Sequence, residues 1–505
     1  MSEAQKTASA WAPLGQSHFR SLWIASVVSN IGGWMDEVGE AWLMTSQTPS
    51  PLLVALLQTA DSLPIFLLAL PAGALADVVD RRRLLLFTQT WMCLAATVLG
   101  VLTLFELATP TILLAIAFAV GIATALNVPA WQAMTPELVP RDQLSAAAAL
   151  GGVGFNIARS VGPAIGGLLV ALMGPGPVFL LNAASFLAVI SALYRWQRRA
   201  PATIAPGERL LTAMRAGLRY AIHAPTFHAV LVRTVAVTFF GSALWGLLPV
   251  VARRDLGLSS IGYGTMLGGL GVGAIAGALV LPRLRQRIPV DLLTALATLS
   301  WALVMIALAV VRVVPVVYAL MLAGGMAWII LIASFNVAAQ IAVPSWVRGR
   351  SLAVYMVAFQ GGIAAGSATW GTVANHASVQ TALIVAALGL VLGLAAILRY
   401  RLPAGEGPNL APSLNWPIPV VAGELDPEEG PVLVQVEYRV EPNRSAEFAS
   451  LMETLKTIRR RDGAFRWGLF HDVAQPDRWL EVFLVESWSE HLRQHERHTV
   501  EDRAK

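Results

Sequence analysis

Long apolar runs, separated by short polar connections, dominate the chain. Each run is about as long as the roughly 20 residues that a helix needs to cross about 30 Å of hydrocarbon. Because backbone groups in lipid must be hydrogen-bonded internally, each run is predicted to be a transmembrane helix. The twelve runs cover residues 19–45, 52–76, 84–106, 111–135, 144–172, 176–195, 226–251, 259–282, 289–311, 315–341, 350–373 and 378–399. We therefore expect an all-α membrane protein with a small additional domain at its C-terminal end.

Arginines gather in every second connection, as after the second run at residues 81–83 and after the eighth at residues 283–287. The opposite connections carry few cations, and the exceptions are Arg253, Arg254 and Arg312. Cytoplasmic connections of membrane proteins are enriched in Lys and Arg. Both chain ends are therefore expected in the cytoplasm.

The composition agrees with a chain that lies largely in a lipid bilayer. Charged residues make up 13% of the chain and the mean hydropathy is +0.62, whereas soluble domains carry about 25% charged residues. The net charge of +5 follows from the arginine-rich connections, so no nucleic-acid partner is indicated. The single cysteine, Cys93, lies in an apolar run and excludes an internal disulfide. The polar segment 1–18 predicts no cleavable signal peptide.

The two halves of the membrane region resemble each other. The stretch from Gly73 to Arg83 recurs from Gly277 to Arg287, and Pro136 to Ser145 resembles Pro344 to Ser351. A repeat of six helices is typical of two-bundle membrane transporters, which bind their substrate near the bilayer midplane between the halves.

Composition and periodicity divide the chain into five parts. Residues 196–225 hold an amphipathic stretch around Leu218, typical of a helix on the cytoplasmic membrane surface. Residues 401–430 are rich in Pro and Gly and predict a linker. The predicted parts are a first six-helix bundle (1–195), a cytoplasmic central loop (196–225), a second six-helix bundle (226–400), the linker (401–430) and a soluble domain (431–505).

Three stretches carry a family resemblance. Gly73 to Arg83 resembles the loop motif of the major facilitator superfamily, Gly-x-x-x-Asp followed by arginines. Ser29 to Met35 and Asn156 to Gly167 resemble the transmembrane secretion effectors, a branch that includes enterobactin-exporter-like proteins. The resemblance covers essentially the whole chain. It implies the major facilitator fold in a bacterial inner membrane and the export of a mid-sized, partly hydrophobic molecule such as a siderophore, antibiotic or drug.

The loop motif is implied to act as a conformational latch at the cytoplasmic end of the helices. A carboxylate there can accept bonds from helix N-terminal amides of the opposite bundle, while the arginines pair with nearby acids. The alternative is that the arginines only set the topology. The second copy has no acid at the position of Asp77, so any latch is asymmetric. The expected latch residues are Gly73, Asp77, Arg81, Arg82 and Arg83.

Ionisable residues inside the predicted spans are the candidates for proton coupling, because buried charge in lipid is costly and usually functional. Asp36 and Glu40 share one helix face while Glu37 points about 100° away. An interfacial position is the alternative for Glu37 and Glu40. Related drug:proton antiporters usually carry an arginine in the fourth span, which has none here between residues 112 and 134. Arg159 is the candidate replacement, and the predicted coupling set is Asp36, Asp61, Glu40 and Arg159.

Aromatic and amide groups within the spans are the candidates for the substrate cavity, since an apolar wall with a few polar groups suits a partly hydrophobic solute. They are Trp34, Gln58, Asn127, Gln132, Asn156, Trp245, Asn336, Gln340 and Gln360. The small residues between Gly162 and Gly167 suit either gating or close helix packing. No Gly-rich Lys-Ser/Thr loop is present, so neither ATP nor another cofactor is expected.

The C-terminal segment changes periodicity. Residues 432–440 alternate, Phe448 to Ile458 follow helical spacing, two alternating runs follow at 464–472 and 478–486, and a helix is predicted at 488–499. This βαββα order predicts a ferredoxin-like α+β domain. It resembles the antibiotic-biosynthesis-monooxygenase-like tail of this transporter branch, most specifically from Trp488 to Arg497.

The role of this domain is left open by its sequence. The fold would need a closing strand beyond Lys505, which another chain could supply, so self-association is one expectation. His491, His495 and His498 share a helix face and could bind a metal, but a plain polar face is favoured and no metal is expected. A regulatory or dimerising module is favoured over an enzyme, because fold does not imply function. An importer, a transporter fused to an oxygenase and a sensor are the remaining alternatives.

Overall fold

The computed structural model describes residues 9–196, 210–403, 409–411, 413, 426 and 429–503. Most of the predicted linker at 401–430, and residues 197–209 of the predicted central loop, lie outside the described residues. The chain divides into two compact units. The first contains Met1–Gly207, Arg233–Phe335 and Met356–Arg399, and the second contains Glu208–Val232, Asn336–Tyr355 and Tyr400–Lys505. Helices α8, α11 and α12 contribute residues to both.

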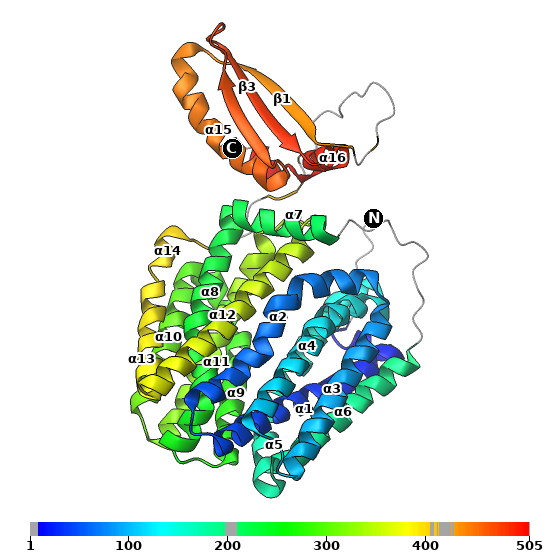
Figure 1. Cartoon of the computed structure of the whole chain (residues 1–505), viewed down its shortest axis with the longest axis vertical. Helices are drawn as coiled ribbons and strands as arrows, with labels where there is room; N and C mark the ends of the chain where they lie inside the picture. The colour runs from blue at the N-terminus through cyan, green and yellow to red at the C-terminus, as the bar shows by residue number, and fades with distance from the viewer. Residues whose placement is uncertain are drawn as a thin grey trace. The chain divides into compact units, whose positions relative to one another are not determined.

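The predicted transmembrane helices are present (Figure 1). Eleven helices of the described residues are long and apolar enough to cross a membrane. The twelfth, α1, has 31 residues, and its three carboxylates lower its hydropathy. The last predicted span is interrupted, because α13 ends at Gly393 and the short α14 follows. The helices are α1 (Ser17–Gln47), α2 (Pro51–Val78), α3 (Arg81–Leu104), α4 (Pro110–Leu138), α5 (Leu144–Met173), α6 (Pro175–Arg195), α8 (Pro225–Val250), α9 (Ser260–Arg287), α10 (Val290–Val310), α11 (Val314–Ile341), α12 (Arg348–His376), α13 (Val379–Gly393) and α14 (Ala396–Arg399).

Local sequence explains where several of these helices begin. Ser50, Thr109 and Ser259 each accept a hydrogen bond from a backbone amide in the first turn of α2, α4 and α9. These side chains satisfy amides that a helix start leaves unpaired. Pro51 and Pro110 follow two of these caps, at a position where the missing N–H costs nothing.

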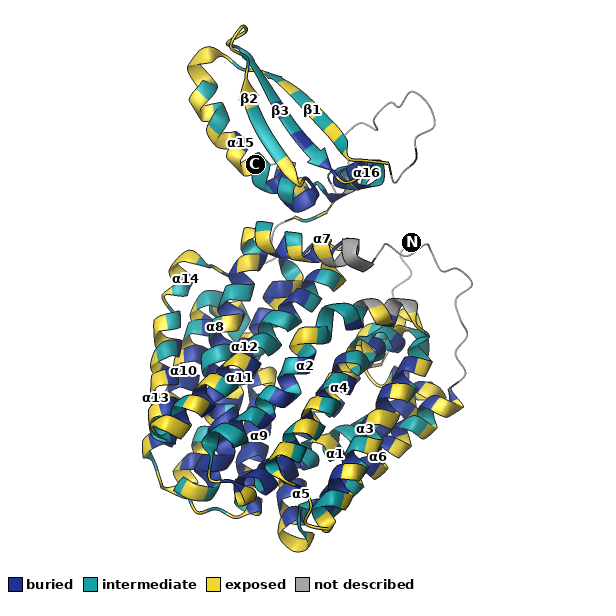
Figure 2. Cartoon of the chain, viewed as in Figure 1, coloured by how far each residue is buried: buried dark blue, intermediate teal, exposed yellow. Residues whose placement is uncertain are grey.

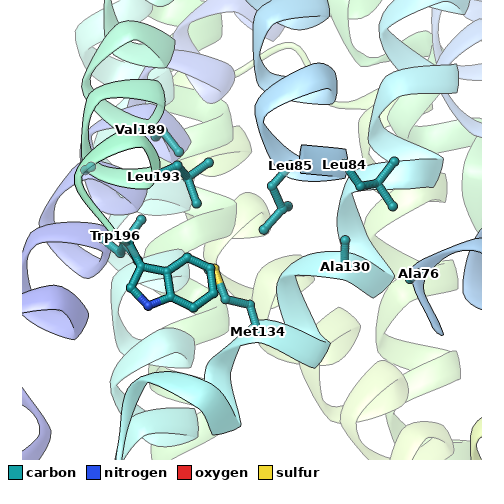
Figure 3. Close-up of a cluster of buried hydrophobic side chains, with 10 residues drawn as sticks. Ala76, Leu84, Leu85, Ala130, Met134, Val189, Leu193 and Trp196 are labelled. Atoms are coloured by element: carbon teal, nitrogen blue, oxygen red, sulfur yellow. The ribbon is translucent and has the colours of Figure 1, made fainter. Parts of the chain in front are cut away.

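Apolar residues fill the interior of the first bundle and also cover its outside. Figure 3 shows one buried cluster, in which Leu85 of α3, Met134 of α4 and Leu193 of α6 lie close to the Trp196 indole. Large apolar side chains such as Leu94, Leu172 and Leu187 are exposed, and exposed positions recur along the helices (Figure 2). An outside this apolar is expected of helices that face lipid.

The glycines of α5 let three helices approach one another closely. A Cβ at Gly162 would lie 2.6 Å from the Cβ of Trp34 in α1, and one at Gly167 would clash with the carbonyl oxygen of Ser260 in α9. Small residues at such crossings are typical of packed membrane helices. The stretch from Gly162 to Gly167 therefore packs α5 against its own half and against the opposite half.

The second unit combines α7 (Leu210–His223) with the α11–α12 connection and the C-terminal domain. The domain has the predicted βαββα order, followed by a short α17, in a three-stranded antiparallel sheet of order β1-β3-β2 (Figure 1). Alternate residues of β1 face the core of the domain. These are Val432, Val434 and Val436, which pack on Phe483 and Val485. The elements are β1 (Val432–Arg439), α15 (Ser445–Asp462), β2 (Arg466–His471), β3 (Arg478–Val485), α16 (Trp488–Arg497) and α17 (Val500–Arg503).

Candidate functional site

Four carboxylates of α1 and α2 lie near one another inside the first unit. Glu40 is only 8% exposed and interacts electrostatically with Asp36, Asp61 and Glu37. Asn182 of α6 lies near Asp36, and Oδ1 of Asp36 is buried and has no hydrogen-bond partner among the described residues. The structure thus brings together the three acids of the predicted coupling set and adds Glu37. Such a cluster can hold protons, because neighbouring buried carboxylates disfavour joint ionisation.

Arg159 of α5 lies beside this cluster. Its guanidinium carbon stands 5.9 Å from the ring centroid of Trp34 and 5.7 Å from that of Trp245. The acid that acts on it electrostatically is Glu37, which also acts on Tyr263 of α9. Trp245 belongs to α8, so helices from both halves of the chain meet at this point.

Glu37 is the residue that the predicted coupling set omitted. It was set apart because it points about 100° from Asp36 around the helix. That same offset directs it toward α5, where Gly162 and Gly166 let α1 approach. No local sequence pattern selects Glu37, because its interaction with Arg159 depends on which face of α1 meets α5.

Three indoles form one wall next to Arg159. The Trp245 ring lies 6.2 Å from Trp301 and 5.8 Å from Trp328, and Trp301 and Trp328 are 4.8 Å apart. Nε1 of Trp245 is buried and has no acceptor among the described residues. An aromatic wall with unused donors suits a partly hydrophobic ligand that carries acceptors. Trp301 and Trp328 were not among the predicted cavity residues.

The other predicted cavity residues differ in their contacts, and their cavity role remains a prediction. Asn127 accepts hydrogen bonds from Thr88 and Gln89 of α3, so it joins α3 to α4. Asn156 donates to the carbonyl of Gly152, and Gln58 lies 3.5 Å from Ser62 of its own helix. Gln132 is exposed and Gln360 is half-buried.

The pair Asn336 and Gln340 belongs to the second unit. Nε2 of Gln340 donates to Oδ1 of Asn336 at 2.6 Å. The cavity role of this pair remains a prediction.

The predicted latch arginines bond within the first half. Arg81 pairs with Glu137 at 2.6 Å and donates to the carbonyl of Ala133. Arg82 donates to the carbonyls of Leu193 and Tyr194. These bonds tie α3 to α4 and α6. The side chain of Asp77 lies outside the described residues, a Cβ at Gly73 would meet no atom within 4 Å, and the latch stays a prediction.

Two arginines that depart from the charge alternation join the halves at the α1–α2 connection. Arg253, in the π-helical turn η3 (Val251–Asp255), donates to the carbonyl of Trp42 and lies over its ring at 4.7 Å. Arg254 donates to the carbonyls of Thr48 and Pro49. A cation is favoured at the carbonyl end of a helix, so these contacts give a local reason for cations at this position.

In the second unit, ion pairs join α7 to the C-terminal domain. Arg219 pairs with Glu490 at 2.9 Å, and Arg497 pairs with the same carboxylate at 2.5 Å. Burial acts to raise the pKa of Glu490, but the bonds and charges of Arg497 and Arg219 outweigh it and hold the pKa below its usual range. The guanidinium of Arg497 also lies 4.5 Å from the ring of Trp346 in the α11–α12 connection. The domain is thereby fixed to α7 and to this connection.

The space between α15 and the sheet is occupied by a saturated polar cluster. Glu481 is fully buried and accepts bonds from Arg459, Trp467 and Tyr438. Burial, followed by the Glu481 charge, raises the pKa of Tyr438 to about 12. All four side chains are therefore engaged with one another.

The predicted histidine face does not gather into a site. The rings of His491 and His495 are 4.9 Å apart, whereas His498 faces the hydroxyl of Ser413. Burial lowers the pKa of all three. Over the ranges that the structure describes, no group of three His, Cys, Asp or Glu residues could hold a metal.

Two bundles of membrane helices around a buried charged and aromatic site define a multi-pass membrane transporter. The family model described as transmembrane secretion effector matches residues 8–504, and the chain belongs to that family of major facilitator transporters. Its relatives and fold neighbours are transporters rather than enzymes.

Three curated relatives cover different shares of the chain. It is 26% identical to the multidrug efflux pump Tap of Mycolicibacterium fortuitum, over 75% of the chain and 94% of Tap. It is 32% identical to the staphyloferrin A transporter of Staphylococcus aureus, over 32% of the chain and 42% of that protein. It is 26% identical to the enterobactin exporter EntS of Shigella boydii, over 56% of the chain and 67% of EntS.

Solved structures support the fold alone. A bacterial homologue of the human lysosomal transporter Spinster, in an inward-facing and unoccupied conformation, aligns with a TM-score of 0.61 at 15% identity. A POT family transporter in complex with 5-aminolevulinic acid aligns with a TM-score of 0.63 at 13% identity. Each covers 76% of this chain and is itself covered to 96%.

Proposed function

We propose that this protein exports a mid-sized, partly hydrophobic molecule from a bacterial cell by proton-coupled alternating access. One observation carries the proposal: the buried carboxylates of α1 and α2 lie beside Arg159 and Trp245, where helices of both halves meet. A site at that position can exchange protons and a ligand with either side in turn.

The nature of the cargo is supported by the aromatic wall and by the relatives. Trp34, Trp245 and Trp301 supply flat apolar surface, and the carboxylates and Arg159 supply the few polar groups. The relatives are named for a multidrug, a staphyloferrin A and an enterobactin substrate. A siderophore, an antibiotic or a lipophilic drug fits this combination.

The arginine-rich connections support an orientation with both chain ends in the cytoplasm and the helices in the inner membrane. The contacts of Arg253 and Arg254 then close the side away from the cytoplasm. We infer that these contacts break when that side opens, and that the loop from Gly73 to Arg83 forms its cross-bundle contacts in that second state.

The C-terminal domain is proposed as a regulatory or self-associating module. Glu481 accepts four hydrogen bonds within the buried polar cluster, so its carboxylate holds the fold together and has no acceptor left for a substrate. Its fixation to α7 and to Trp346 supports a role in the position of the α11–α12 connection.

The test is efflux from cells that carry wild-type protein or Asp61→Asn, with a panel of lipophilic drugs and catecholate siderophores, with and without a protonophore. The proposal predicts efflux that the protonophore stops and that Asp61→Asn reduces at least tenfold. Glu106→Gln, in an exposed connection, is the matched control and should leave efflux unchanged. Efflux that survives the protonophore would rule out proton coupling, and accumulation in place of efflux would identify an importer.

A further inference from the structure

Arg159 differs from every other buried arginine among the described residues. Five arginines are at most 9% exposed: Arg159, Arg233, Arg459, Arg461 and Arg497. The last four each pair with a carboxylate, those of Asp291, Glu481, Asp502 and Glu490 respectively. Arg159 makes no hydrogen bond, and no ion pair within 4 Å, to any residue that the structure describes.

An unpaired buried guanidinium is costly to maintain. Removing a single partner from a buried ion pair is strongly destabilising, because the remaining charge is left uncompensated. The surroundings of Arg159 offset only part of that cost, since Trp34 and Trp245 contribute cation–π attraction from more than 5 Å. Aromatic rings accept no strong hydrogen bonds, so the five N–H donors of Arg159 stay available to a ligand.

The geometry also indicates the chemistry of that ligand. A guanidinium is planar and its paired donors match the two oxygens of a carboxylate. The adjoining indoles of Trp34 and Trp245 favour a flat, apolar body next to that group. Nε1 of Trp245 is a further buried donor without an acceptor.

We propose that Arg159 binds a carboxylate of the transported molecule, carried on an aromatic body that packs against Trp34 and Trp245. This inference rests on the proposed function and assigns a substrate class to that same site. Glu37 is the internal acid whose charge acts on Arg159 in the absence of a ligand, and the incoming carboxylate replaces it. The export of an anion is also favoured by the inside-negative membrane potential.

Direct binding to the purified full-length protein tests this assignment. The probes are 2-naphthoate, its neutral amide 2-naphthamide and the cation 2-naphthylmethylammonium, with affinity measured by calorimetry. Wild-type protein should bind the carboxylate at least about tenfold more tightly than the amide, the scale of one charge-assisted pair. Arg159→Gln should abolish that preference while the affinity for the amide stays within about twofold.

Glu37→Gln distinguishes binding from a merely structural role. Removal of the competing acid should tighten carboxylate binding several-fold, whereas a structural role for Arg159 predicts no gain. Arg283→Gln, an exposed arginine at the end of α9, should leave all three affinities unchanged. Equal affinities of wild-type protein for the carboxylate and the amide, or a preference for the cation, would overturn the proposal.

Efflux by the same variants distinguishes a failure of the proposed export function from a failure of the proposed substrate class. If wild-type protein and Arg159→Gln both export compounds by a protonophore-sensitive route and neither prefers the carboxylate to the amide, the proposed function stands and the substrate class is wrong. If carboxylate binding depends on Arg159 but no compound is exported, the substrate class stands and the exporter is wrong.

Discussion

Buried charges occur in both units of this protein, but their surroundings differ. In the C-terminal domain Glu481 is fully buried and accepts bonds from Arg459, Trp467 and Tyr438. In the membrane helices Glu40 is buried to a similar degree, yet its neighbours are other acids. Burial alone therefore does not distinguish the charges of the C-terminal domain from those of the membrane helices. The difference is that the former are saturated, meaning that they bond to oppositely charged or polar partners, whereas the latter are not. Saturated charges specify the fold, whereas unsaturated ones are costly unless they serve a function.

The largest effect on stability should come from the saturated set. Glu481→Gln removes the carboxylate that neutralises the buried Arg459 charge, so we expect the C-terminal domain to lose about 3–5 kcal/mol. Hydrogen exchange of residues 432–485 in the full-length protein measures this loss. Glu437→Gln, which breaks an exposed pair with Arg478, is the control and should cost less than about 1 kcal/mol. Equal effects of the two substitutions would contradict the comparison.

The unsaturated set should show the opposite pattern. Glu40→Gln removes an acid that only like charges surround, so thermal stability should stay level or rise. Efflux should fall by about a hundredfold, equivalent to about 2.7 kcal/mol, because a proton site is lost. Stability and efflux are measured on the same preparation, with Glu106→Gln as the exposed control. A drop in stability with efflux preserved would place Glu40 among the structural charges.

Acid should weaken the stabilisation that the ionised Asp502 gives to the C-terminal domain, over a defined range of pH. Burial acts to raise the pKa of Asp502, but the bonds of Arg461 and Thr499 outweigh it and hold the pKa at about 2, below the ordinary 3.8. A depressed pKa stabilises the fold above the ordinary value, and that stability is lost as pH falls toward 2. The loss should be about 2 kcal/mol.

Unfolding of wild-type protein and Asp502→Asn at pH 5 and pH 2.5 tests this sign. The difference between the two proteins should shrink at the lower pH. Burial raises the pKa of Asp462 instead, so Asp462→Asn should not reproduce the shrinkage. A gap for Asp502→Asn that widens in acid would show that Asp502 is not held ionised by Arg461.

The smallest effect is expected where a charge has a second partner. Arg219→Gln removes one of the three arginines that pair with Glu490, and Arg497 and Arg493 remain. The contact between α7 and the C-terminal domain should weaken by about 1 kcal/mol. Hydrogen exchange in residues 210–223 should rise several-fold. Arg215→Gln is the control, since Arg215 is exposed and 3.9 Å from Glu486, and should change exchange little.

Periodicity carried most of the fold prediction. An apolar run of about 20 residues predicts a membrane-spanning helix, and the alternation of residues 432–440 predicts a strand. The membrane helices and the βαββα order were therefore predicted correctly. The interruption between α13 and α14 was missed, because Gly393 to Ala395 are as apolar as the helices that they separate.

The candidate site was recovered only in part. Asp36, Asp61 and Arg159 could be selected because an ionisable residue within an apolar run is visible in the sequence. Glu37, Trp301 and Trp328 could not, because their roles depend on which face of one helix meets another. The same limit explains Asn127, whose amide turns toward α3. The contact of Arg219 with Glu490 joins residues far apart in the chain, and no local pattern announces it.

Substrate-driven proton movement in proteoliposomes, followed with a pH-sensitive dye inside the vesicles, tests the central claim most directly. The purified full-length protein and Asp61→Asn are compared with an exported compound from the efflux panel. The account predicts proton movement on substrate addition for wild-type protein, and none for a stably folded Asp61→Asn protein. Proton movement of equal size in both proteins would contradict it.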